Sequence, residues 1–168
     1  MSPVEIPALA QGDIRLLGTQ TAQYLLASKN LARVSYVAAD RTPRVFPMLF
    51  HWTGEELVFA TFAGAKKINS IRRRPAIAVS IDENVMPPLV LLLRGDAIIT
   101  DFDGILPEYR GMHYRYAGPE QGERNVAEVE RPGVRMARIS LRPSWVGVLD
   151  FTTRFPGDST PKEFQNRG

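Results

Sequence analysis

The chain has 168 residues, of which 44% are hydrophobic and 23% are charged. This composition is typical of a globular protein and excludes a chain that is disordered throughout. The absence of cysteine excludes disulfides, thiolate metal sites and a cysteine nucleophile. The apolar run over residues 87–93 is far shorter than the roughly 18 to 20 residues of a membrane-spanning helix. We therefore expect no membrane contact and no signal peptide, which fits a cytoplasmic location.

The positive charges are concentrated in one segment. The chain has 21 lysines and arginines and 18 aspartates and glutamates, but residues 66–74 hold five basic residues and no acid. The remainder therefore has 16 basic and 18 acidic residues. A protein that coats nucleic acid spreads its positive charge over a wide surface. The sequence thus predicts a nearly neutral domain with one basic segment.

The start of the chain predicts an arm followed by a helix. Residues 1–17 contain two prolines and little periodicity, which indicates an extended N-terminal arm. A short helix is expected over residues 19–28, with Thr19 or Thr21 as the N-cap.

Three segments rich in β-branched and aromatic residues follow, over residues 31–39, 44–52 and 57–62. Turn-forming residues separate them by about four positions, which predicts an antiparallel meander. Pro47 removes a hydrogen-bond donor from the second strand. That strand is therefore expected at a sheet edge or at a bulge.

The hydrophobic period then changes. Ile68 and Ile71 lie three residues apart within residues 63–74, and Pro75 follows, which predicts a short helix directly after a strand. Two strands are then expected over residues 76–82 and 89–101, the second with a bend at Gly95. A helix over residues 107–116 is followed by a loop up to residue 132. A pair of strands over residues 134–151 and an irregular tail over 154–168 complete the chain.

Six or seven strands with two or three helices predict a mainly β protein. The short connections indicate a closed or partly closed antiparallel β-barrel rather than a βαβ sheet. No linker divides the sequence, so one domain is expected over residues 1–168. Neither G-x-G-x-x-G nor a Walker loop is present, which excludes the common nucleotide-binding folds by their own motifs.

The junction between the third strand and the next helix is the strongest candidate for a binding site. A helix N-terminus offers free N–H groups and a positive dipole end, which suit a phosphate. Lys66 and Lys67 fall in the first turn, where cations are unfavourable unless an anion binds. Thr61 and Ser70 add hydroxyl groups nearby. The alternative is a solvated basic face opposite the apolar stripe of the helix.

The region from Leu31 to Asp82 resembles the pyridoxamine 5′-phosphate oxidase-like superfamily of flavin-binding split barrels. Three segments carry the resemblance, in this order: LARVSYVAADRTPRVFPMLFHW, ELVFATF and AKKINSIRRRPAIAVSID. The resemblance implies a split β-barrel of the FMN-binding type. It also implies a homodimer with FMN at the subunit interface and an oxidoreductase that acts on a small molecule.

The resemblance also implies the residues that bind the cofactor. The second strand lies along the flavin ring in this family, and the end of the third strand with the following helix holds the phosphate. The corresponding positions here are Arg44, Val45, Phe46 and Pro47 for the ring and Thr61, Lys66, Lys67 and Ser70 for the phosphate. The family often has Ser-Arg-Lys where this chain has Ala65-Lys66-Lys67, which removes a hydroxyl and a bidentate guanidinium.

Several alternatives stay open. The deazaflavin F420 has a longer anionic tail than FMN, and Arg72 to Arg74 suit such a tail. Some relatives degrade haem with an axial histidine, for which His113 is a candidate, and a sensor or storage module would bind flavin or haem without turnover. The tail after Arg154 lacks histidine, which argues against pyridoxamine phosphate oxidase activity itself.

Other residues carry less information. Trp145 is a candidate either to close the cofactor site of the partner subunit or to pack in the core or the dimer interface. No catalytic residue is identified. Asp101 and Asp103 have no third ligand at a suitable spacing, so no metal site is expected. Nucleic-acid binding by the basic helix is the weakest alternative, and we expect no nucleic-acid partner.

Overall fold

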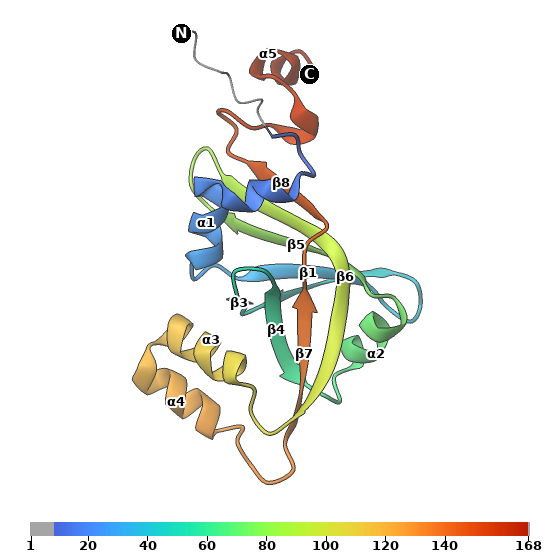
Figure 1. Ribbon diagram of the computed structural model, residues 1–168, viewed down its shortest axis with the longest axis vertical. Helices are drawn as coiled ribbons and strands as arrows, with labels where there is room; N and C mark the ends of the chain where they lie inside the picture. The colour runs from blue at the N-terminus through green and yellow to red at the C-terminus, as the bar shows by residue number, and fades with distance from the viewer. Residues whose placement is uncertain (1–8, 168) are drawn as a thin grey trace.

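The computed structural model describes residues 9–167 and is mainly β (Figure 1). The strands are β1 Ala32–Val37, β2 Pro43–Met48, β3 His51–Trp52, β4 Leu57–Phe62, β5 Ala76–Glu83, β6 Leu89–Asp103, β7 Arg135–Leu141 and β8 Trp145–Leu149. The helices are η1 Ile14–Gly18, α1 Gln20–Ala27, α2 Lys66–Arg73, α3 Pro107–Ala117, α4 Pro119–Ala127, η2 Pro156–Asp158 and α5 Pro161–Gln165, where η denotes a 3-10 helix.

The strands form one open antiparallel sheet in the order β2-β1-β5-β6-β7-β4-β3, and β8 pairs with β6 beside this path. The first half of β6 pairs with β5 and β8, and its second half pairs with β7. The long, curved β6 therefore joins the two halves of the split barrel (Figure 1). The mainly β fold predicted from the sequence is confirmed, with eight strands because the two-residue β3 is separate.

Gly95 lies where β6 passes from one half of the sheet to the other. A Cβ atom at this position would lie 2.9 Å from Cδ1 of Leu141 and 3.1 Å from the backbone oxygen of Arg142. A side chain here would therefore displace the end of the Leu141 side chain and crowd the backbone of Arg142. The bend predicted at Gly95 coincides with this change of partners.

The predicted meander is confirmed only in part. Its first two strands pair as β1 and β2, but its second and third strands pair only through the two residues of β3, which lie opposite the start of β4. On its other side β4 pairs with β7 along its whole length. The chain leaves β2 after Met48 and buries Phe50 completely, which carries it into the other half of the sheet. The edge position predicted from Pro47 is confirmed, because β2 is an end strand of the path.

Three other expectations need correction. The predicted loop after α3 contains α4, and the predicted irregular tail contains η2 and α5. Pro119 and Pro161 occupy the first turn of α4 and α5, where proline suits a helix start. The predicted arm lies partly outside the described residues, and its last residues form η1. The predicted helix at 19–28 is confirmed, with Thr19 as its N-cap.

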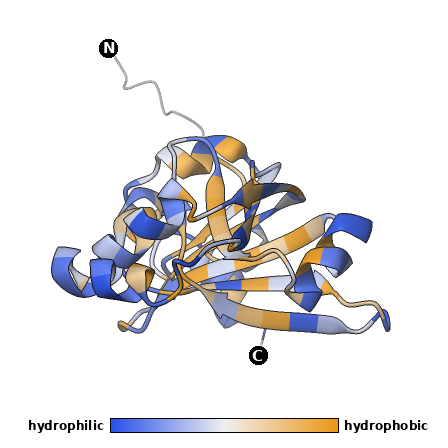
Figure 2. Cartoon of the chain, turned by 90° about the horizontal axis from the view of Figure 1, so that it is seen from below, coloured by the Kyte–Doolittle hydropathy of each residue, from blue (hydrophilic) through white to orange (hydrophobic). Residues whose placement is uncertain are grey.

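The core lies between the sheet halves and the helices that cover them. Every second residue of most strands lies in this core, for example Ile77, Val79 and Ile81 of β5, as expected for strands with one face toward the core. Hydrophobic residues are orange in Figure 2. Ile68 and Ile71 bring the apolar face of α2 into this core, as the sequence predicts. The helices α3 and α4 pack on each other beside β4 (Figure 1). In residues 9–167, no helix is long and apolar enough to span a membrane.

Candidate functional site

The N-terminus of α2 is open. Ala65 is its N-cap and provides no side-chain hydrogen bond. The first turn also lacks acidic residues, and the N–H groups of Lys66 and Lys67 have no partner among the described residues. A helix start with unpaired N–H groups and two lysines suits an anion.

Lys67 points from this helix start onto β2. Its Nζ atom lies 3.8 Å from the ring centroid of Phe46, a cation–π geometry. Partial burial lowers the pKa of Lys67, and no described carboxylate forms an ion pair with it. An anion near Nζ would offset the cost of burying this charge.

Lys67 lines a cavity of about 300 Å³ that we call the α3 cavity. Its walls come from β2, β4, α2, α3 and β7. Four of the eight predicted cofactor residues line it: Phe46, Pro47, Thr61 and Lys67. The structure therefore brings the predicted ring strand and the predicted phosphate helix to one cavity.

Three other predicted residues line a second cavity of about 480 Å³, here called the β1–β2 basin: Arg44, Lys66 and Ser70. Asn69 and Arg73 of α2 line it as well. Ser70 is buried, and the Arg44 guanidinium forms an ion pair with Asp40 at 2.9 Å. Hydrogen bonds from Thr42 and Arg44 lower the pKa of Asp40 to about 2.

Val45 lines neither of these two cavities and is 64% exposed on the edge strand. Trp145 lies under the Arg94 guanidinium at 3.9 Å and against Gly12, and it lines neither cavity. Arg72 forms an ion pair with Asp101 at 2.5 Å. The residues of the predicted site are thus divided between the α3 cavity, the basin and the exposed edge.

The α3 wall of the cavity is a feature that the sequence analysis missed, apart from naming His113 as a candidate haem ligand. Tyr109, Met112 and His113 line the cavity from this helix. The rings of Tyr109 and His113 lie 4.4 Å apart at 53°. Burial raises the pKa of Tyr109 and lowers that of His113. The spacing of four residues between these two rings is a signal in the sequence, because such residues share one face of a helix.

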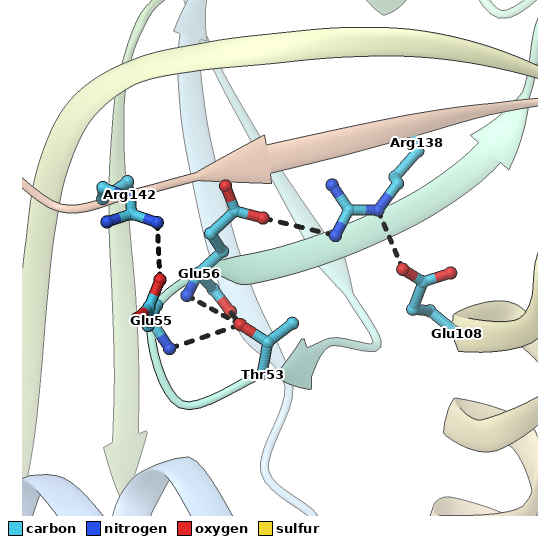
Figure 3. A network of polar contacts seen from close by, with 6 residues as sticks. All are labelled: Thr53, Glu55, Glu56, Glu108, Arg138 and Arg142. Atoms are coloured by element: carbon cyan, nitrogen blue, oxygen red, sulfur yellow. Dashed lines mark hydrogen bonds and ion pairs between the residues drawn. The ribbon is translucent and has the colours of Figure 1, made fainter.

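An ion-pair network fixes the start of α3 to the sheet (Figure 3). Arg138 of β7 reaches Glu108 of α3 at 2.8 Å and Glu56, which precedes β4, at 3.3 Å. All three side chains are between 21% and 27% exposed. Burial opposes ionisation of Glu108, but hydrogen bonds led by that from Arg138 outweigh it and lower its pKa. The network places the helix that carries Tyr109 and His113 over the cavity.

Comparisons with known proteins address the fold. No protein-family model matches this sequence, and no curated protein matches it significantly in sequence. A solved F420 reductase is 26% identical, with a TM-score of 0.55, over 74% of this chain and 94% of that chain. A conserved hypothetical protein from Mycobacterium tuberculosis is 17% identical, with a TM-score of 0.60, over 79% of this chain and 85% of that chain.

A third similar structure, from Clostridium acetobutylicum, is related to general stress protein 26 and assigned to the pyridoxinephosphate oxidase family. It is 14% identical, with a TM-score of 0.56, over 82% of this chain and 90% of that chain. The strand order and these structures agree with the resemblance in sequence. The chain has the split-barrel fold of the pyridoxamine 5′-phosphate oxidase-like superfamily.

Proposed function

We propose that this protein is an oxidoreductase that binds the phosphate-bearing flavin cofactor FMN in the α3 cavity and acts on a small molecule. The observation that carries the proposal is Lys67, a half-buried cation without an acidic partner in residues 9–167, at an uncapped helix N-terminus beside the Phe46 ring. A phosphate fits this donor set, because the ammonium and the free N–H groups of α2 both favour an anion.

The residues of the chain have separate tasks in this proposal. Bound flavin would supply the redox chemistry. Lys67 and the first turn of α2 hold the phosphate, and the hydroxyl of Thr61 adds a hydrogen bond. Phe46 and Pro47 of the edge strand provide the surface for the ring. Tyr109 and His113 close the opposite wall and exclude water from it.

Titration with FMN, followed by the quenching of flavin fluorescence, tests the cofactor proposal. Saturable binding is expected, and no binding would overturn it. Reduction of the bound flavin by a nicotinamide donor then separates an enzyme from a sensor or storage module. A bound flavin that no such donor reduces would favour the module.

F420 is the second candidate cofactor. The β1–β2 basin supports it, because Lys66 and Arg73 line this second cavity and neither forms an ion pair with a described acid. FMN would place one phosphate at Lys67 and leave the basin free. An F420 reductase is also the similar structure with 26% identity.

The double variant K66A/R73A distinguishes the two cofactors. If the anionic tail of F420 lies in the basin, the variant weakens F420 binding roughly tenfold or more and leaves FMN binding within about twofold. The dissociation constants are measured by fluorescence for both cofactors. Equal effects on both would contradict a tail site in the basin.

We also propose that the protein forms a homodimer through the β2 edge, with the cofactor at the interface. Val45, Phe46 and Phe62 are between 43% and 64% exposed near this edge and the α3 cavity. Burying such apolar side chains between subunits is favourable. Sedimentation velocity is expected to show a dimer for the wild type and a shift toward monomer for V45D. A wild-type monomer at micromolar concentration would contradict the dimer.

A further inference from the structure

A chain of hydrogen bonds along α4 leads to His113. Arg124 donates from Nε and Nη2 to Oε1 of Gln121 at 3.2 and 2.9 Å. Because a guanidinium only donates, this atom of Gln121 must be the oxygen. The Gln121 amide nitrogen therefore faces Asn125 and donates to its Oδ1 at 2.8 Å. The remaining amide group, Nδ2 of Asn125, lies 3.3 Å from Nδ1 of His113.

This order of donors fixes the tautomer of His113. The amide nitrogen of Asn125 can only donate, so Nδ1 of His113 must accept and carries no proton. In the neutral ring the proton then lies on Nε2. Burial favours the neutral ring, because it lowers the pKa of His113. The second nitrogen is thereby left as an N–H donor.

The packing of α4 on α3 maintains this arrangement. A Cβ atom at Gly122 would lie 2.8 Å from the backbone carbonyl of His113 and 2.6 Å from Cδ1 of Tyr114. Only glycine allows α4 to approach so closely, and Asn125 follows three residues later on that helix. The imidazole also contacts the ring of Tyr109. Both contacts hold the ring of His113 at the wall of the α3 cavity.

We propose that Nε2–H of His113 donates a hydrogen bond to an acceptor atom of a planar ring system bound in the α3 cavity. Phe46, Met112 and Met136 give this cavity apolar walls that suit a flat ring. A ring carbonyl or ring nitrogen is the acceptor. Asn125 is a positioning residue, because it acts on the ligand only through His113. The inference rests on the proposed function in taking this cavity as the ligand site.

Imidazole nitrogen-15 NMR of the protein without ligand tests the tautomer. The chain has two histidines, so H51Q assigns the signals of His113. The wild type is expected to show the Nε2–H tautomer. In N125D the new carboxylate accepts from Nδ1, so the proton is expected to move to Nδ1 and the pKa of His113 to rise. An Nδ1–H tautomer in the wild type, or an unchanged tautomer in N125D, would overturn the proposed relay.

Two ligands then test whether His113 donates a hydrogen bond and whether the acceptor belongs to a cofactor or to a substrate. FMN carries acceptors on a cofactor ring, and 1-indanone carries a carbonyl on a small planar ring. A shift of the His113 Nε2 signal with FMN supports a bond to the cofactor, and a shift with 1-indanone alone supports a bond to a substrate. No shift with either would overturn the proposal. If 1-indanone shifts the signal but the protein does not bind FMN, the hydrogen bond from His113 is supported and the proposal of FMN as cofactor is contradicted.

The variant H113F provides the matched control, because it keeps the aromatic contact with Tyr109 and removes the N–H donor. For the ligand that shifts Nε2, binding to H113F is expected to weaken about fivefold. Indane, which lacks the carbonyl of 1-indanone, is expected to bind both proteins equally. Equal binding of the shifting ligand to wild type and H113F would contradict a hydrogen bond from His113.

Discussion

Replacing Lys67 with alanine is expected to weaken FMN binding about 30-fold, which corresponds to the roughly 2 kcal/mol of a hydrogen bond to a charged group. Riboflavin, which lacks the phosphate, is expected to lose less than about twofold. The difference arises because Lys67 and the free N–H groups of α2 contact the phosphate in the proposed complex, and the ring lies on the β2 side. Fluorescence titration of both flavins measures the two losses.

The variant R72A is the matched control for this experiment. Arg72 lies on the same helix, but it forms an ion pair with Asp101 and lines neither the α3 cavity nor the basin. Its removal is expected to leave the affinity for FMN within about twofold. Equal losses of FMN and riboflavin in K67A, or an equal loss of FMN in R72A, would contradict the role assigned to Lys67.

Replacing Arg138 with alanine is expected to lower the free energy of unfolding by about 2–3 kcal/mol. The variant leaves the carboxylates of Glu56 and Glu108, both about three-quarters buried, without their shared cation (Figure 3). For a chain of this size the loss corresponds to a decrease in Tm of roughly 5–10 °C. Because α3 is fixed to the sheet through Glu108, FMN binding is expected to weaken as well.

Arg142 offers a control within the same network. Its ion pair with Glu55 joins side chains that are 67% and 70% exposed, so R142A is expected to cost less than about 0.5 kcal/mol. The pKa of Glu108 is lowered in the folded protein, so the contribution of the Arg138 pair is present above pH 4.5 and lost as the pH falls through the lowered value. Equal Tm changes in R138A and R142A would contradict the account.

The sequence predicts the elements of this fold better than their pairing. Local patterns suffice for α2, where Ile68 and Ile71 mark the buried face and Pro75 ends the helix. The partner of β4 is a long-range property, since β7 lies more than 70 residues further along the chain. Adjacent strands with short connections predict a hairpin, which forms here only between the two-residue β3 and the start of β4.

In the candidate site, too, local features are predicted from the sequence and long-range contacts are not. Lys67 and Phe46 are predicted from the resemblance in sequence, and the structure places them in contact. Lys66 is adjacent to Lys67 but lines the other cavity, because neighbouring positions of a helix point in different directions. Arg44 lies two residues from Phe46 on β2, nearer the turn between β1 and β2, and lines the basin there. The α3 wall depends on the ion pair between Glu108 and Arg138, whose separation of 30 residues no local pattern reveals.

Mass spectrometry of the ligand that copurifies with the native protein, followed by titration of the stripped protein, tests the central claim most directly. The account predicts that FMN, or F420 if the basin holds an anionic tail, copurifies and rebinds to the stripped protein with a stoichiometry of one per chain. A protein that carries neither cofactor and binds neither on titration would contradict it.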